Sequence, residues 1–147
     1  MSTSQLTQDE ANALFSAEKY RTDEREWEYL CTSGALAIPL VSADKRETFT
    51  LDLSRGRIDI SRGKYQNRAR QVIVLARLDF GGRPHGNPDG EAIPHLHLYC
   101  EHYGDKWACT PPPERFPNLD DLWGTLHHFM AYCNVVDPPA FRRGLFS

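Results

Sequence analysis

The stretch of sequence that decides the fold is KYQNRARQVIVLARLDF, residues 64–80. Its centre, residues 72–75, is a run of β-branched and aliphatic side chains, which indicates a buried strand in the middle of a sheet. In an extended chain, successive side chains point to opposite faces. Residues 64–70 would therefore place on one face the polar side chains of Lys64, Gln66, Arg68 and Arg70. The sequence predicts a sheet that contains a cationic strand.

Shorter strand patterns lie on both sides of this stretch. Apolar or alternating segments predict strands at residues 35–41, 48–53, 57–60, 95–101 and 106–109. Residues 81–94 are rich in Gly and Pro, which predicts a long loop. Gly104 and Asp105 are expected to form a two-residue hairpin turn between the last two strands.

A helix is expected at each end of the chain. Thr7 and Glu10 have the spacing of a capping box before apolar residues with helical spacing, which predicts a helix over residues 8–20. Asn118 is the expected N-cap of a second helix with an apolar stripe. The element order predicts an α+β fold in a single domain, residues 1–147. We expect an antiparallel sheet of about six strands, which could curl into a partial barrel, flanked by an N-terminal and a C-terminal helix.

The bulk composition limits the class of protein. With 40% hydrophobic and 25% charged residues, the chain can bury a core and is not expected to be disordered. No apolar run approaches the roughly 20 residues of a membrane helix, and residues 1–10 lack the apolar core of a signal peptide. We therefore expect a cytoplasmic protein with reduced cysteines. The alternative is a disulfide between Cys100 and Cys109 across the predicted hairpin.

The net charge of −3 conceals a strong asymmetry along the chain. Residues 54–77 carry seven basic residues and one acidic residue, a net charge of +6, whereas residues 1–30 and 79–105 each have a net charge of −4. A cationic cluster of this kind favours RNA as the partner, because Lys and Arg bind phosphate oxygens. The residues expected to bind this substrate are Arg55, Arg57, Gln66, Arg70, His85 and Tyr99. The alternative is a solvated sheet face with cross-strand salt bridges to Asp52, Asp59 or Glu101.

The sequence PHLHLYCE, residues 94–101, predicts a second polar strand face. Alternation would place on that face the side chains of His95, His97, Tyr99 and Glu101, with the leucines between them in the core. Two imidazoles can act as general base and general acid near neutral pH, and a nearby cation can stabilise the charge that develops on a phosphorane. The sequence therefore predicts metal-independent RNA cleavage without a cofactor. The expected catalytic residues are His95, His97, Lys64 and Arg68.

Metal binding is the competing interpretation of the same strand. The spacing His95-x-His97-x-x-x-Glu101 resembles the first motif of the cupin family, which would make these three residues metal ligands. The second cupin motif is absent, because His127 and His128 lie in the predicted C-terminal helix. A third interpretation is that the histidines make structural hydrogen bonds on a half-exposed sheet.

Four motifs together resemble a family of small bacterial proteins of unknown function. They are KYQNR at 64–68, HxNPDG at 85–90, PHLHLY at 94–99 and GDKW at 104–107. The size and motif style are similar to toxin components of toxin–antitoxin or phage-defence modules, which implies an endoribonuclease with an antitoxin or another protein as partner. The alternative is a non-enzymatic inhibitor or binding protein in phage–host conflict. Tyr99 or Trp107 could stack on an RNA base.

Overall fold

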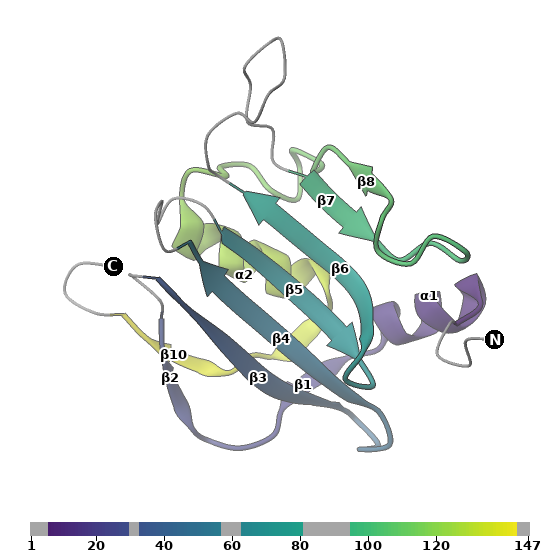
Figure 1. Cartoon of the computed structure of the whole chain (residues 1–147). Helices are drawn as coiled ribbons and strands as arrows, with labels where there is room; N and C mark the ends of the chain where they lie inside the picture. The colour runs from purple at the N-terminus through teal and green to yellow at the C-terminus, as the bar shows by residue number, and fades with distance from the viewer. Residues whose placement is uncertain (1–5, 30–32, 57–62, 81–94, 144–147) are drawn as a thin grey trace, which may run out of the picture.

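The computed structural model describes residues 6–29, 33–56, 63–80 and 95–143, and Figure 1 shows the whole chain. The helices are α1 (Gln8–Ser16) and α2 (Leu122–Tyr132). The long strands are β3 (Gly34–Ser42), β4 (Thr48–Arg55), β5 (Gly63–Ala69) and β6 (Ile73–Phe80). The short strands are β1 (Lys19–Arg21), β2 (Glu26–Glu28), β7 (His95–Leu98), β8 (Ala108–Cys109), β9 (Val135–Asp137) and β10 (Ala140–Arg142).

These residues form an α+β fold around a large, curled sheet (Figure 1). Its strand order is β8-β7-β6-β5-β4-β3-β1-β9, and all neighbours are antiparallel except β1 and β9. A separate parallel pair joins β10 to β2. The expected α+β class with two helices is therefore confirmed, but the described residues form a mostly antiparallel sheet of eight strands instead of a purely antiparallel one of about six. The strands that were not predicted are mostly three residues long, too short for a repeating pattern to identify them.

The stretch that decides the fold forms a hairpin. A turn separates β5 from β6, and its residues Arg70 and Gln71 have positive φ angles of 52° and 70°. Beyond this turn, Ile73 pairs with Ala69. The expectation that Arg70 continues the polar face of the strand is therefore wrong, because the chain reverses at that residue.

The helix ends differ from those expected. The capping box of α1 is confirmed: the Thr7 hydroxyl accepts from the Glu10 amide at 3.1 Å, and the Thr7 amide donates to the Glu10 carboxylate at 3.0 Å. The helix ends at Ser16 because Lys19 begins a strand instead of a further helical turn. The N-cap of α2 is Asp121, not Asn118.

One face of the sheet packs on α2, which lies behind β4 and β5 in Figure 1. Residues of β5 that alternate with the cationic ones, Tyr65, Asn67 and Ala69, are buried on this side. The Tyr65 hydroxyl donates to the Leu122 carbonyl at 2.9 Å, and it lies 2.8 Å from the hydroxyl of Tyr29. These contacts hold α2 against the middle of the sheet, and neither of the two described helices covers the opposite face of β4–β7.

The turn between β7 and β8 differs from two of the predictions made from the sequence. It closes between Cys100 and Gly104, whose backbones exchange hydrogen bonds of 2.9 and 2.8 Å, instead of at Gly104 and Asp105. Its register pairs Cys109 with Leu96 instead of with Cys100. Cys100 and Cys109 are free thiols, so the alternative of a disulfide between them is wrong.

Neither α1 nor α2 is long and apolar enough to cross a membrane, and the search that gives this result covered the described part of the chain.

Candidate functional site

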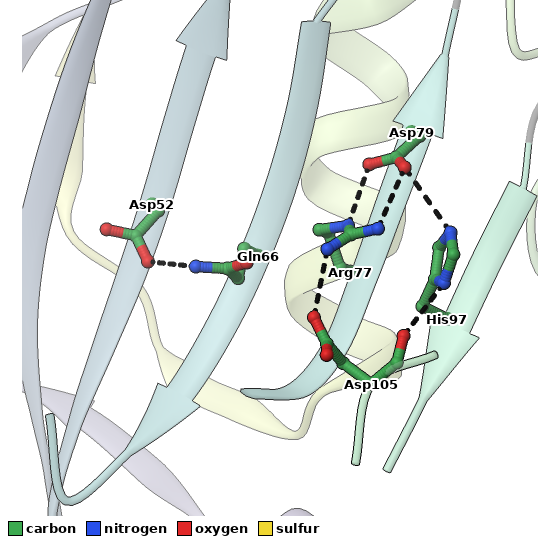
Figure 2. Close-up of polar contacts among 6 residues, drawn as sticks. All are labelled: Asp52, Gln66, Arg77, Asp79, His97 and Asp105. Carbon is green, nitrogen blue, oxygen red and sulfur yellow. Dashed lines mark hydrogen bonds and ion pairs between the residues drawn. The ribbon is translucent and has the colours of Figure 1, made fainter. Parts of the chain in front are cut away.

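The face of the sheet that no helix covers carries two rows of side chains across β4, β5, β6 and β7. The Arg77 row consists of the register partners Asp52, Gln66, Arg77 and His97. The Asp79 row consists of the register partners Ser54, Lys64, Asp79 and His95. Cross-strand partners point to the same side of a sheet, so the cationic strand and the histidine strand share one face, called here the open face. Figure 2 views six side chains of this region.

Arg77 is the centre of the ion pairs on the open face. Its Nε lies 3.0 Å from one oxygen of Asp79, and its Nη2 lies 3.2 Å from the other. Its Nη1 donates to the Asp105 carboxylate at 2.9 Å (Figure 2). Asp105 follows the turn after β7, so one guanidinium joins β6 to the segment between β7 and β8. A planar guanidinium with several donors is suited to hold two carboxylates in fixed positions.

His97 lies beside this arginine, and each of its ring nitrogens faces a polar atom. Its Nδ1 lies 2.9 Å from the Asp105 carbonyl oxygen, and its Nε2 lies 3.4 Å from an oxygen of Asp79. A carbonyl oxygen only accepts, so Nδ1 carries the hydrogen. The side chain is 14% exposed. In this arrangement neither ring nitrogen of His97 faces outward to a substrate.

Arg68, at the other side of the face, is also paired. Its Nε and Nη2 donate to the two oxygens of Asp52 at 2.6 and 2.9 Å. Its Nη1 donates to the Gln71 carbonyl at 2.6 Å, and Gln66 donates to Asp52 at 2.9 Å. The hydrogen bond with Asp52 raises the pKa of the Arg68 guanidinium. The salt bridge to Asp52 that the sequence left as an alternative is therefore present.

Lys64 and His95 differ from these residues. Each is exposed and lies opposite Asp79, Lys64 on one neighbouring strand and His95 on the other. Neither side chain has a hydrogen bond or ion pair to another residue of the described segments. The His95 ring lies 6.3 Å from that of His97, measured between centroids. Within the described part of the chain, neither group would have to give up a bond in order to contact a ligand.

Two residues that were expected on the histidine strand face hold the N-terminal segment instead. Tyr99 donates its hydroxyl hydrogen to the Leu6 carbonyl at 2.6 Å and accepts from the Leu6 amide at 2.8 Å. Glu101 accepts from the Gln8 amide at 2.7 Å, at the start of α1. Because β7 ends at Leu98, the expected row of four polar side chains contains only two.

The remaining expected residues are dispersed. The Arg70 guanidinium binds Glu47 at 3.0 and 2.8 Å, away from the Arg77 and Asp79 rows. Arg55 is the last residue of β4. Arg57 and His85, together with the strand at 57–60 and the loop at 81–94, fall outside the described residues. Among the residues that are described, no group of three or more His, Cys, Asp or Glu side chains could hold a metal ion.

The open face has a balanced charge among its described residues. Lys64, Arg68 and Arg77 are matched by carboxylates on neighbouring strands or on the turn, namely Asp52, Asp79 and Asp105. Arg77, Asp79 and Asp105 were not predicted from the sequence as site residues. A signal was present, since Arg77 and Asp79 alternate within β6 as the histidines do within β7, but only the register shows that the two pairs meet.

Comparison with known proteins places the chain in one family. A family model described as a family of unknown function (DUF6978) matches residues 6–135. No curated protein and no solved structure matches the chain.

Proposed function

For a chain that belongs to this family of unknown function, DUF6978, we propose that the open face binds RNA and that Lys64 and His95 cleave it. One observation carries the proposal. An exposed ammonium and an exposed imidazole lie opposite the same aspartate, on strands at either side of β6, and neither is engaged by another described residue. The expectation from the sequence, a metal-independent endoribonuclease, is kept, and its catalytic residues are reduced to these two.

The spacing of the two strands is compatible with one phosphodiester. Neighbouring strands lie about 4.8 Å apart, so the backbones of β5 and β7 are separated by roughly 10 Å. Lys64 and His95 stand on the two sides of that interval, each as the register partner of Asp79, and the flexible Lys64 side chain is long enough to span part of it. A phosphate above Asp79 would therefore lie within reach of both groups.

The reaction requires one base and one acid. The neutral His95 imidazole takes the proton of the ribose 2′-hydroxyl, and the 2′-oxygen forms a bond to phosphorus. The bond between phosphorus and the 5′-oxygen breaks, and the Lys64 ammonium donates a proton to that oxygen after stabilising the charge of the phosphorane. The products are a 2′,3′-cyclic phosphate and a 5′-hydroxyl. Exchange with solvent removes the proton from His95 and returns one to Lys64.

In this proposal the ion pairs of the Arg77 row, and the ion pair of Arg68 with Asp52, have a structural role. Arg68, Arg77 and His97 keep their carboxylate and carbonyl partners while the substrate is bound. Their role is to hold β4–β7 and the β7–β8 turn in a fixed arrangement, because interlocked charged hydrogen bonds resist local movement. They are positioning residues and do not touch the reacting atoms.

The test uses the purified chain and a fluorescent single-stranded oligoribonucleotide. The wild-type protein should produce a 2′,3′-cyclic phosphate end in the presence of a chelator, and an all-deoxy oligonucleotide should remain intact because it lacks the nucleophile. His95→Ala and Lys64→Ala should each reduce the rate of cleavage strongly. His127→Ala is the matched control, since this exposed histidine lies in α2, which packs on the face of the sheet opposite the open face. Undiminished cleavage by His95→Ala would show that the assignment is wrong.

A second candidate is an RNA- or protein-binding module without catalytic activity, such as an inhibitor. The observation that favours it is the pairing of Arg68 and Arg77 with Asp52, Asp79 and Asp105, which gives a stable, charge-balanced surface. Expression in bacterial cells separates the two candidates. A ribonuclease toxin should arrest growth unless His95 is replaced, whereas an inhibitor should be tolerated in both forms.

A further inference from the structure

Two exposed aromatic side chains lie on the turn between β7 and β8. Tyr103 is 57% exposed and Trp107 is 60% exposed, with their ring centroids 6.0 Å apart and their planes inclined by 43°. Large apolar side chains normally gain free energy by burial, so a pair of exposed aromatics on one short segment requires an explanation. The exposed Lys106 lies between them in the sequence.

The turn that carries this pair is rigidly bonded. Besides the hydrogen bonds between Cys100 and Gly104, the Tyr103 amide donates to the Cys100 carbonyl at 2.9 Å, and the Lys106 amide donates to the Tyr103 carbonyl at 3.2 Å. Gly104 has a φ of +62°, a backbone conformation that favours glycine. The aromatic pair is therefore displayed on a defined backbone.

Two residues of the Arg77 row, which lie on the sheet, bind the same turn. His97 binds the Asp105 carbonyl and Arg77 binds the Asp105 carboxylate, so residue 105 is fixed at both its backbone and its side chain (Figure 2). Asp105 lies two residues from Tyr103 and two from Trp107. The two contacts with Asp105 therefore connect the open face to the turn that carries the aromatic pair.

We propose that Tyr103 and Trp107 stack on unpaired bases of the RNA, which makes single-stranded RNA the substrate class. The inference rests on the proposed function, because the same RNA would continue from the open face to the turn. Aromatic rings accept any base by stacking, and a cation beside them binds the adjoining phosphate, a role that the exposed Lys106 fills. In a duplex the bases are already stacked on one another and are not available.

The experiment measures binding by fluorescence anisotropy with a labelled single-stranded oligoribonucleotide and with the duplex of the same sequence. All proteins carry Lys64→Ala so that the RNA stays intact. Trp107→Ala should weaken single-strand binding about tenfold, since the loss of one stacked base costs about 1–3 kcal/mol. Trp107→Phe should retain most of the affinity. Val72→Ala, at an apolar side chain of similar exposure on the β5–β6 turn, is the matched control.

A second readout tests stacking directly. Single-stranded RNA should quench the Trp107 fluorescence, seen as the difference between the Lys64→Ala protein and its Trp107→Phe form. Quenching that disappears in the Trp107→Phe form, while the preference for single strands is retained, is a sign of stacking that a general loss of the fold would not give. Thermal unfolding of each variant checks that the turn remains folded.

The outcomes distinguish the two proposals. If the Lys64→Ala protein and the wild-type protein both fail to bind RNA, the proposed function and this inference are both wrong. If RNA binds but Trp107→Ala and Tyr103→Ala behave like Val72→Ala, stacking is wrong and the proposed function stands; a protein partner for the turn would give this result. Equal weakening of single-strand and duplex binding would also overturn stacking.

Discussion

The two rows of the open face lie next to each other on the same four strands, yet they differ in what their side chains bind. In the Arg77 row, Arg77 and His97 are fully engaged by Asp79 and Asp105. In the Asp79 row, the flanking Lys64 and His95 have no such partner among the described residues. Alternation along a strand therefore decides the face on which a side chain lies. Carboxylates on neighbouring strands decide whether that side chain remains available to a ligand.

The largest expected effect is on the rate of RNA cleavage, and it should differ between the imidazoles of the two rows. His95→Ala should lower the rate of RNA cleavage by about 10²–10⁴-fold, the usual contribution of a general base, and leave the free energy of unfolding unchanged. His97→Ala should lower the free energy of unfolding by about 1–2 kcal/mol, because the Asp105 carbonyl loses its donor. Single-turnover kinetics measure the rate of cleavage, and urea unfolding measures the free energy of unfolding, for each variant. Equal losses of cleavage in the two folded variants would remove the distinction between the rows.

The next effect concerns a cation on the buried side of the sheet. Lys19 is 0% exposed, and its Nζ donates to the carbonyls of Phe15, Ala17 and Cys133 at 2.8, 3.0 and 2.7 Å. It thereby binds backbone oxygens near the C-terminal ends of both helices. Lys19→Met should destabilise the protein by about 3 kcal/mol, since buried acceptors lose a charged donor. Urea unfolding at neutral pH measures the change.

The same lysine should make the free energy of unfolding depend on pH. Burial lowers the pKa of Lys19 from 10.5 to about 8 in the folded protein. The unfolded chain therefore holds more protons between these values, and the contribution of Lys19 to the free energy of unfolding should rise by about 2 kcal/mol from pH 7 to pH 10. The Lys19→Met variant lacks this contribution, whereas that of Cys133, whose pKa burial raises to about 12, has the opposite sign. A difference between the wild-type protein and this variant that falls with pH would contradict the assignment.

A smaller effect compares two arginines. Arg77→Met leaves two half-buried carboxylates without their donor and should cost about 2 kcal/mol of unfolding free energy. Arg70→Met removes a more exposed pair at the β5–β6 turn and should cost about 0.5 kcal/mol. Thermal or urea unfolding ranks them. An equal cost for both variants would show that the Arg77 row is no more than an ordinary surface ion pair.

The smallest effect is the acid dependence of the Arg70 pair. The hydrogen bond from Arg70 lowers the pKa of Glu47 below its ordinary 4.5 in the folded protein. The stabilisation is therefore complete above pH 4.5 and is lost as the pH falls through the folded-state pKa, a change of about 0.5 kcal/mol for an exposed pair. Glu47→Gln and Arg70→Met should both remove this part of the stability curve between pH 5 and 3, about the range in which such carboxylates titrate.

The α+β class, the capping box of α1 and the alternating polar side chains of β5 and β7 could be predicted from the amino-acid sequence alone. These follow from patterns within a few consecutive residues, since alternation and capping need only local geometry. The turn at Arg70 was missed because neither Arg70 nor Gln71 belongs to the residues that usually adopt a positive φ. The strands near the termini were missed because partners distant in the sequence stabilise them.

Only the tertiary structure decided which polar side chains meet. The register of β4–β7 places Asp52 beside Arg68, and it aligns Asp79 with Lys64 and with His95. The turn after β7 brings Asp105 to Arg77, a pair separated by 28 positions along the chain. Local patterns carry no information on such pairings, because register depends on the packing of whole strands against α2 and on one another. The physical difference between a paired arginine and an available lysine on one face is therefore a property of the folded sheet.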